Sequence, residues 1–406
     1  MKKLILLLVI TLSTISYSQT EITDDNFYTA INTCLSTNAT DGMCTDSEYG
    51  AMPDWDVSNV TNMFGVFYNK TTFNGDISGW DVSNVTNMNS MFKDSSFNQP
   101  IGDWYVSSVN EMYEMFDGAT SFNQPIGDWN VSNVTNMENM FRGANSFNQP
   151  IGDWDVSNVT SMKWVFKNAD AFNQPIGDWD VSNVTNMYNM FKDSSFNQPI
   201  GDWDVSNVTN MNSMFKDSSF NQPIGDWDVS NVTDMNSMFI DTDVFNQSLG
   251  SWNVTNVTDM TNMFDNSGLS TPNYDATLIS WSLQNVQSGV ELGALGINFC
   301  NSIDAKARLI DNYGWNIIDD GYSCTTAGLD DQNQLDISIY PNPTSDIVYI
   351  DGNYTQLKVV VYDILGKEIL NKSITNSIDI SHLDNGIYIL QLSDGVKLTT
   401  QRIIKN

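Results

Sequence analysis

Apolar and polar positions follow one another in a fixed order that recurs along most of the chain. The stretch FNQPIGDWDVSNVTNM occurs unchanged at 172–187 and 196–211, and variants of it run from about residue 51 to residue 268. Its tryptophans stand 24 or 25 residues apart, at Trp55, Trp80, Trp104, Trp129, Trp154, Trp179, Trp203, Trp227 and Trp252. This period is typical of a solenoid, whose short units bury their apolar faces only by stacking on one another. The pattern predicts nine coils around one continuous core.

Each coil is expected to contain a short helix and a short parallel strand. Some apolar positions have helical spacing, as in Val208, Met211, Met214 and Phe215. Thr209 is placed to cap the first turn of this helix. Pro223 removes a ladder donor, so the strand is expected to begin near Ile224 and to pair with neighbouring coils at about 4.8 Å.

The Phe, Ile, Trp, Val and Met positions are expected to fill the interior. A methionine-rich stripe could instead form an adaptable binding surface, but its helical spacing favours core packing. Some coils depart from the pattern, at Tyr105, Ser108, Trp164, Val165 and the pair Ser248-Leu249. These departures mark either a patch for a partner or drift within a tolerant array, and we favour drift.

The segment before the repeats, residues 19–50, is expected to cap the first coil. Asp24 or Asp25 can begin a helix whose apolar residues share one face. These residues are Phe27, Ala30, Ile31, Cys34 and Leu35. Such a helix would cover the core and backbone edge that the first coil leaves open.

The segment after the repeats, residues 269–327, is expected to cap the last coil. Two helices are predicted, at Tyr274–Gln284 and Ser302–Tyr313, and Gly314 ends the second. The array and its two caps would thus form one unit.

Four cysteines flank the repeats and none lies inside them. Four cysteines allow three connectivities, but the separation imposed by a stack of coils favours Cys34 with Cys44 and Cys300 with Cys324. Disulfides suit an oxidising compartment. A reactive or metal-binding thiol is the disfavoured alternative, because no histidine lies nearby.

The two ends of the chain carry different signals. Residues 1–18 combine two lysines, an apolar run and small residues, which predicts a secretory signal peptide cleaved before Gln19. No later stretch is apolar enough to span a bilayer. Residues 328–335 are polar and predict a linker. Residues 336–406 predict a small all-β, immunoglobulin-like sandwich, with strands at Ile337–Tyr340, Ile347–Ile350, Leu357–Tyr362, Ile378–Ile380, Ile387–Leu392 and Leu398–Ile404.

The charge is strongly unbalanced and lies mostly in the repeat-containing part. Of 49 acidic and 17 basic residues, 41 and 11 fall within residues 1–335, and the whole chain has a formal net charge of −32. Such a field repels nucleic acid and anionic membranes, and it favours solubility, cations or basic partners. A role in binding nucleic acid is therefore not expected.

The repeats lack the residues for most catalytic constellations. His382 is the only histidine and lies near the C-terminus, so catalysis by serine, cysteine or a metal with histidine has no basis in the repeats. Paired acids such as Asp202 and Asp204, or Glu111 and Glu114, could serve glycoside hydrolysis. However, the Asp pair recurs in most coils, whereas a catalytic pair is needed once. We expect neither an enzyme nor a cofactor.

The recurring aspartate before tryptophan has two interpretations. Its copies should stack from coil to coil, and they are Asp103, Asp128, Asp153, Asp178, Asp202 and Asp226. Calcium would relieve the repulsion between them, but aspartate also forms turns by bonding to its own backbone, which we favour. The recurring Asn-x-Thr, as at Asn207, would mark N-glycosylation in a eukaryotic secreted protein; a structural role is the stronger interpretation here.

The motif W-x-V-S-x-V-T-x-M-x-x-M-F with F-N-Q-x-I, over residues 51–268, resembles the repeats of BspA-like leucine-rich-repeat surface proteins and Mycoplasma-type surface lipoproteins. This resemblance implies a right-handed, leucine-rich-repeat-like solenoid with short parallel strands and short helices at the cell surface. Some relatives act as adhesins. The segment N-F-C-N-S…G-W…C resembles the closing segment found after such repeats.

The last 70 or so residues resemble the C-terminal sorting domain of type IX secretion substrates in Bacteroidetes. The matching positions are Pro341, Asn342, Pro343, Gly366, Lys367, Gly386 and Tyr388, followed by the terminal I-I-K-N. The resemblance implies that type IX secretion machinery is a partner and that the protein is secreted or attached to the outer-membrane surface of a Gram-negative bacterium.

The sequence thus predicts a non-enzymatic, adhesin-like interaction protein exported by type IX secretion. Its extracellular ligand would be a protein or a glycan. The alternatives are a structural spacer without a specific ligand and, less favoured, a glycan-binding accessory to an enzyme.

Overall fold

The computed structural model describes residues 20–324, 335, 337–352, 354, 356–363, 367–395 and 397–406. The chain divides into two compact units, residues 1–324 and 325–406. The predicted signal peptide, its cleavage position and residues 328–334 of the predicted linker lie outside the described residues.

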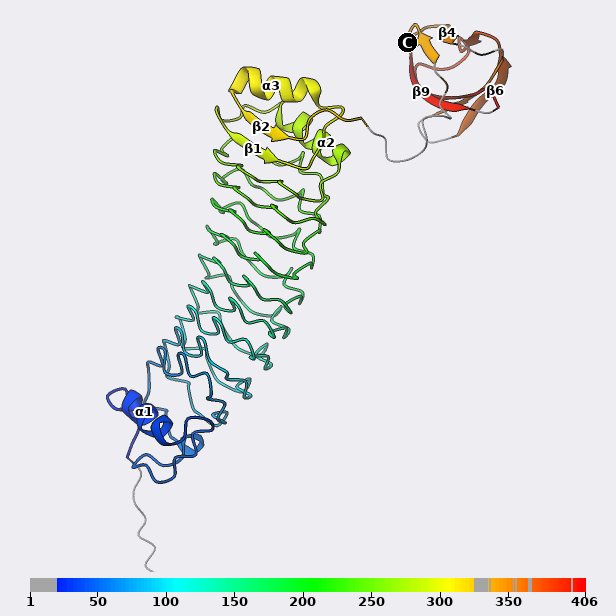
Figure 1. The fold of residues 1–406 in the computed structure, drawn as a ribbon. Coiled ribbons are helices and arrows are strands. Elements are labelled where there is room, and N and C mark those ends of the chain that lie inside the picture. Colours follow the sequence, from blue (N-terminus) through cyan, green and yellow to red (C-terminus); the bar gives the residue numbers. More distant parts are fainter. Residues whose placement is uncertain are drawn as a thin grey trace, which may run out of the picture. The chain divides into compact units, whose positions relative to one another are not determined.

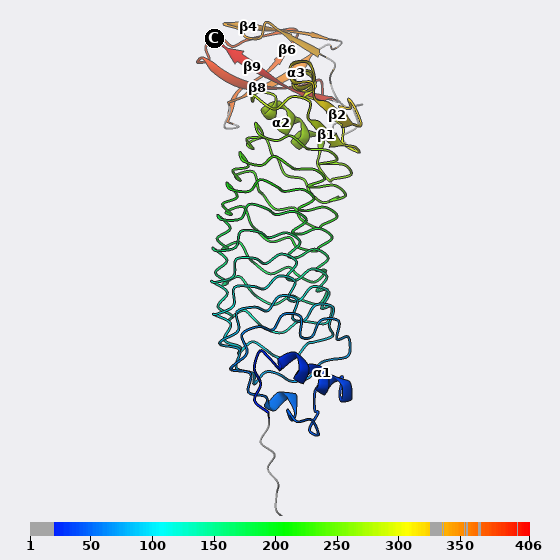
Figure 2. The ribbon, with the colours of Figure 1, turned by 90° about the vertical axis from the view of Figure 1, so that its left-hand side faces the viewer.

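In the first unit, the repeats form successive coils that stack on one another (Figure 1). Parallel β-bridges join each coil to the next at one position per coil. These positions are Asn62, Asn87, Glu111, Asn136, Ser161, Asn186, Asn210, Asp234 and Asp259. A single cluster of buried apolar side chains runs from Ile22 through all the coils to Trp315. The coils therefore share one core with the segments at both ends. The view turned by 90° shows the coils stacked between helix α1 and the elements α2, β1, β2 and α3 (Figure 2).

The helix expected within each coil does not form. After the 3-10 helix η1 (Met52–Asp54), no α-helix begins until α2, and the residues between them, all of which are described, form turns and single bridges. Every second backbone N–H group in this segment bonds to the next coil instead of to its own: those of Met211, Ser213 and Phe215 donate to carbonyls of the next coil. Ser213 has a φ of 55°, which interrupts a right-handed helix. Bonding between coils replaces the helical bonds because every interior coil offers its carbonyls to a neighbour.

The strand expected near Ile224 is also wrong. The bridge between coils lies at Asn210 instead. The Ile224 carbonyl accepts the backbone N–H of Trp227 at 3.3 Å, which closes a tight turn, and the indole Nε1–H of Trp252 at 2.9 Å. Thr209 caps no helix, because its Oγ1 donates to the carbonyl of Thr185 in the preceding coil at 3.2 Å.

The N-terminal end of the stack is covered by helix α1 (Phe27–Thr37), whose five predicted apolar residues are all buried. Its N-cap is Asn26, so the expected capping by Asp24 or Asp25 is wrong. Asp24 instead accepts the backbone N–H and Oγ1–H of Thr61 at 2.8 and 2.6 Å. In later coils this backbone N–H donates to a threonine carbonyl of the preceding coil, as from Thr209 to Thr185 at 2.9 Å. The first coil has no predecessor, and Asp24 supplies the missing acceptor.

The C-terminal end of the stack contains helix α2 (Thr271–Trp281), strand β1 (Glu291–Ala294), helix α3 (Ile303–Tyr313) and strand β2 (Asn316–Asp319). Strands β1 and β2 pair in parallel. Both predicted helices are present, and Gly314 ends α3 with a φ of 68°. Helix α2 begins three residues earlier than predicted because Pro272 occupies its first turn, where no N–H is needed.

Two features fix these end segments. The disulfides Cys34–Cys44 and Cys300–Cys324 are both formed, as predicted. The Asp275 side chain in α2 is buried and accepts the backbone N–H groups of residues 300, 301 and 302 and the hydroxyl of Ser302. These bonds satisfy donors just before α3 and tie the two helices together.

The second unit contains two antiparallel sheets that share one buried apolar cluster. The first has the order β3-β4-β7 and the second β6-β5-β8-β9. Their bounds are β3 (Ile337–Tyr340), β4 (Ile347–Gly352), β5 (Leu357–Tyr362), β6 (Glu368–Ile374), β7 (Ser377–Asp379), β8 (Gly386–Ser393) and β9 (Leu398–Lys405). All six predicted strands are present, with small shifts at their ends. Strand β6 was not predicted because it is an edge strand with almost no buried side chains, and therefore no apolar alternation.

Candidate functional site

The side chains that differ most between coils lie on one face of the repeats, which we call the ladder face. It comprises four positions per coil: the two residues after the first methionine of the M-x-x-M-F motif and the two residues after its phenylalanine. In one coil these are Tyr188, Asn189, Lys192 and Asp193. The ladder face follows directly after the residues that form the bridges between coils.

The other faces are uniform because their side chains hold neighbouring coils together. The indole N–H of each repeat tryptophan from Trp104 onward donates to the carbonyl of the preceding coil's isoleucine, as from Trp203 to Ile176 at 3.0 Å. The asparagine of F-N-Q forms a second ladder, in which Asn173 Oδ1 accepts the backbone N–H of Asn197 at 2.9 Å. Substitution at either position would leave a polar group of a neighbouring coil without its partner.

The Asn-x-Thr motif has a structural role of the same kind. Asn207 Nδ2, the atom that glycosylation would modify, donates to the carbonyl of Ser182 at 2.8 Å. The same bond recurs along the stack, for example from Asn183 to Ser157 and from Asn231 to Ser206. Recurrence of this motif therefore follows from coil stacking.

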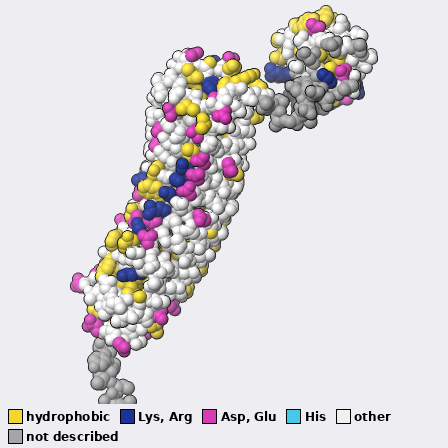
Figure 3. Space-filling view, in the orientation of Figure 1, with side chains coloured by type: hydrophobic (Ala, Val, Ile, Leu, Met, Phe, Trp, Pro, Cys, Tyr) yellow, Lys and Arg dark blue, Asp and Glu magenta, His cyan; other side chains and the backbone are white. Residues whose placement is uncertain are grey.

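Cations and aromatic side chains gather on the ladder face. Six of the seven basic residues within 51–268 lie there, the other being Lys70. They are Lys93, Arg142, Lys163, Lys167, Lys192 and Lys216. Figure 3 shows Lys and Arg side chains concentrated over the middle coils, among acidic and apolar side chains. The aromatic residues of this face are Phe64, Tyr68, Tyr113, Trp164 and Tyr188.

Two of these cations are neutralised by a buried acidic cluster. Lys93 Nζ lies 2.7 Å from Glu114 and 3.1 Å from Asp117, and Arg142 forms two hydrogen bonds of 2.7 Å with Asp117. Burial opposes ionisation of Glu114, but the hydrogen bonds from Lys93, Tyr113 and Ser90, together with the charge of Lys93, outweigh it and lower the pKa of that carboxyl. Glu111, the other acid of this predicted pair, accepts a bond from Asn89 at 3.2 Å. The pair is thus engaged in separate contacts.

Lys167 differs from these cations because it forms no ion pair with any described residue. Burial and the neighbouring charge of Lys192 lower the pKa of its ammonium group. In the same coil, Trp164 has a φ of 57° and its ring meets that of Tyr188 edge to face, with 5.2 Å between centroids. A positive φ is unusual for so bulky a residue. This coil therefore combines a cation that has no ion-pair partner among the described residues with a strained, partly exposed tryptophan.

The departures from the repeat fall into two groups. Val165 and Leu249 are buried in the core, where they replace methionine and isoleucine, so they are changes of interior packing. Tyr105 is 65% exposed and Trp164 is partly exposed, so these two alter the surface. Ser108 replaces the asparagine of the Asn-x-Thr motif and is exposed.

The six stacked aspartates are exposed, and none of their side chains forms a hydrogen bond with a described residue. Turn formation belongs to the other aspartate of each pair: Asp204 Oδ1 accepts the backbone N–H of Ser206 at 3.0 Å, and Asp180 does the same with Ser182. Hydrogen bonds from Ser182 and Ser230 lower the pKa of Asp180 and Asp228, respectively. No group of three or more His, Cys, Asp or Glu side chains within the described residues is placed to hold a metal ion.

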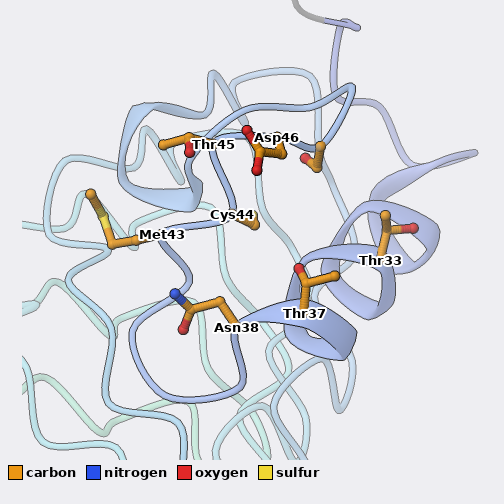
Figure 4. A pocket seen from close by; sticks show the side chains of 8 residues that line it. Thr33, Thr37, Asn38, Met43, Cys44, Thr45 and Asp46 are labelled. Atoms are coloured by element: carbon orange, nitrogen blue, oxygen red, sulfur yellow. The ribbon is translucent and has the colours of Figure 1, made fainter.

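A shallow pocket of about 340 Å³ lies in the N-terminal cap beside the Cys34–Cys44 disulfide (Figure 4). Hydroxyl, amide and apolar side chains line it together with one carboxylate. The lining residues are Thr33, Thr37, Asn38, Met43, Cys44, Thr45, Asp46 and Ser47. This set offers a single acidic group and no histidine, so it contains no acid–base pair.

The predicted sorting positions are distributed over the second unit. Asn342 contacts strand β9: its Nδ2 donates to the carbonyl of Arg402, and its Oδ1 accepts the N–H of Ile404, both at 2.9 Å. Pro341 and Pro343 flank it. The Tyr388 hydroxyl donates to the carbonyl of Asp384 at 3.0 Å, and Gly386 begins β8. Lys367 bonds through its N–H to Asp363, whereas Gly366 lies outside the described residues.

The fold is that of a repeat protein with few helices and a C-terminal domain of antiparallel sheets. Residues 38–148, 125–218 and 194–294 match the family model described as "Mycoplasma protein of unknown function, DUF285". These ranges cover more than half of the 406 residues, and the chain belongs to this family. Residues 338–406 match the secretion system C-terminal sorting domain. No curated protein matches the chain.

Both resemblances found in the sequence are thereby confirmed. The sorting domain marks the chain as a secreted or cell-surface protein of the Bacteroidetes type, and it implies the secretion machinery as a partner. None of the helices in the described residues is long and apolar enough to cross a membrane.

Proposed function

We propose that this protein is a non-enzymatic, adhesin-like interaction protein that type IX secretion displays at the cell surface. In this proposal the repeats form a right-handed, leucine-rich-repeat-like solenoid and the C-terminal sheets an immunoglobulin-like sorting domain. The parallel bridges between coils support the solenoid, and the cluster shared by the two sheets supports the sandwich. The absence of a helix and a strand in each coil separates these coils from ordinary leucine-rich repeats.

One observation carries the binding role. Side chains vary on the ladder face, whereas the other faces repeat nearly unchanged and are engaged in bonds between coils. A uniform stack with one variable, partly aromatic face is the arrangement by which repeat proteins combine a constant scaffold with a specific surface. A spacer without a ligand would not need cations and aromatic rings gathered on a single face.

The experiment is a binding screen with the purified mature protein. Arrays of extracellular-matrix proteins, bacterial surface extracts and glycans would be probed at micromolar concentration. Saturable binding to one class supports the interaction role. Absence of binding to every class, with the protein folded by circular dichroism, would favour the spacer.

Export can be tested separately. Mass spectrometry of the protein recovered from the cell surface should find an N-terminus at Gln19 and a missing or modified sorting domain. A variant lacking residues 338–406 should remain inside the cell envelope. Surface display of that variant would contradict the proposed role of the domain.

A further inference from the structure

We propose that the middle of the ladder face, around Trp164, Lys167, Tyr188 and Lys192, binds a linear polysaccharide that carries carboxylate groups. This inference rests on the proposed interaction function and names the chemistry of the ligand.

The cations of this region are arranged in a column. Arg142, Lys167, Lys192 and Lys216 occupy the same position in four successive coils. Neighbouring coils that pair through their backbones are about 4.8 Å apart, so the column is a regular row of positive charge along the stack. Like charges at this spacing repel unless anions compensate them. The whole chain has a formal net charge of −32, so a row of cations on one face is a clear local departure from the overall charge.

One cation of the row, Lys167, has no ion-pair partner among the described residues. Arg142 pairs with Asp117, and Lys192 lies 2.6 Å from Asp193. At the corresponding place in the coil of Lys167, the neighbouring residue is Asn168, which is neutral, and no described anion pairs with Lys167. An anion supplied from outside would complete the row here through a charge-assisted hydrogen bond.

Aromatic surface lies next to the same cation. Trp164 is three residues before Lys167, and its ring contacts that of Tyr188 in the next coil. Other coils place asparagine, serine, glycine or glutamate at the position of Trp164. Retaining tryptophan at positive φ carries a conformational cost of order 1–3 kcal/mol, which the structure elsewhere must offset. Such strain, together with a partly exposed ring, indicates a contact surface.

A polysaccharide fits these features better than an acidic peptide. The apolar face of a sugar ring packs on an aromatic ring, its hydroxyls donate and accept hydrogen bonds, and a uronate carboxylate pairs with lysine. An extended peptide would bind by adding a strand to a free backbone edge. On the ladder face the N–H groups of Met187, Asn189 and Phe191 already donate to the next coil, so no such edge is available.

The test uses the full mature protein and three polymers of matched length. Polygalacturonate is the probe, neutral dextran controls for sugar alone, and polyglutamate controls for carboxylate on a peptide. Isothermal titration calorimetry should detect binding to polygalacturonate only, and the affinity should fall as NaCl is raised because the contact is partly ionic. Equal binding to polyglutamate, or no binding to polygalacturonate, would overturn the inference.

Three variants locate the site. K167Q should weaken polygalacturonate binding about tenfold, which corresponds to the loss of one charge-assisted bond. W164N should weaken it to a similar extent without unfolding, because the coils before and after already place Asn139 and Asn189 at this position. K70Q, a matched loss of charge in the first coil, should leave binding unchanged. Equal losses in K70Q and K167Q would show a general charge effect and contradict the assigned site.

Failure of this inference can be told apart from failure of the proposed function. A protein that binds no acidic polysaccharide but binds another surface partner on the arrays retains its interaction role. In that case W164N and K167Q would bind that partner as the unsubstituted protein does.

Discussion

At the scale of single residues, the repeat is stabilised by side chains that bond to the backbone of a neighbouring coil. The tryptophan of each coil from Trp104 onward shows this best, since its ring is in the core while its indole N–H donates to the isoleucine carbonyl of the preceding coil. Burying an indole without such an acceptor would forfeit a hydrogen bond in a region without water. The same residue therefore provides both apolar area and the register between coils.

Trp203→Phe tests this double role. The variant keeps an aromatic ring but loses the bond to Ile176 and leaves a gap beside it. We expect a loss of about 2 kcal/mol in the free energy of unfolding, from the lost bond and the incomplete packing together. Denaturant unfolding followed by circular dichroism measures it. Trp164→Phe, on the surface, is the matched control and should change stability by less than about 0.5 kcal/mol.

Asp24→Asn tests the carboxylate that completes the first coil. Burial opposes its ionisation, but the bonds from Thr61 and Asn62 outweigh this and lower the Asp24 pKa below its ordinary 3.8. A lowered folded-state pKa stabilises the protein above pH 3.8, and this contribution is lost as the pH falls through the folded-state value. Because Asp24 is exposed, we expect only about 0.5 kcal/mol.

Melting temperatures of the protein and of Asp24→Asn, measured from pH 2 to 7, check this prediction. The difference should be present near pH 6 and vanish toward pH 2. Asp25→Asn is the control, since Asp25 makes no corresponding bond to Thr61. A difference that grows as the pH falls would contradict the assigned role of Asp24.

At the scale of elements, the two ends of the stack are closed by different means. Helix α1 lays five apolar residues on the first coils. The C-terminal end adds α2, the parallel pair β1 and β2, and α3, with the buried Asp275 joining the two helices. Each end also carries one disulfide. The ends need such reinforcement because a terminal coil has a neighbour on one side only.

Loss of the Cys300–Cys324 disulfide should destabilise the C-terminal end. The bond closes a loop across 24 residues, and its removal is expected to cost about 3 kcal/mol through the greater freedom of the unfolded segment. Hydrogen exchange of a Cys300→Ser/Cys324→Ser variant should show faster exchange in α3 and β2. Coils near Trp104 should keep their protection, because each coil contacts only its neighbours. Uniform loss of protection along the stack would show that the array unfolds as one unit instead.

At the scale of the whole molecule, acidic side chains recur regularly along the repeats, whereas the ladder face carries most of their basic side chains. The exposed aspartates before tryptophan recur at the same position in successive coils, whereas the ladder face gathers six of the seven cations of the repeats. Exposed charges in water interact weakly and are screened by salt. The net negative charge of the aspartate column is expected to favour solubility, while the cation row makes one face distinct.

Calcium dependence can be decided on this basis. We expect NaCl to raise the melting temperature by screening the aspartate column. Millimolar calcium should add nothing beyond magnesium at equal ionic strength, because these aspartates are exposed and hold no common ligand set within the described residues. A specific increase with calcium, reversed by a chelator and absent in Asp178→Asn/Asp202→Asn, would instead establish a calcium ladder.

Much of the architecture could be predicted from the sequence. The period of the tryptophans predicted the coils, and the apolar face of residues 27–35 predicted helix α1. Gly314 predicted the C-terminal end of α3. Spacing of apolar residues reports which side chains are buried, and this does not depend on the exact backbone path. Alternation likewise located six strands of the second unit but missed β6, whose side chains are mostly exposed.

The sequence by itself determined the repeat, the buried positions, the disulfide pairs and the sorting domain. Only the tertiary structure decided the backbone within a coil, because spacing of Met211, Met214 and Phe215 fits a helix equally well until the neighbouring coil competes for their N–H groups. It also decided which of the variable positions lie together on one face. The environment of Trp164 and Lys167 depends on the coils on either side, which place Tyr188 beside the ring and, within the described residues, give Lys167 no ion-pair partner.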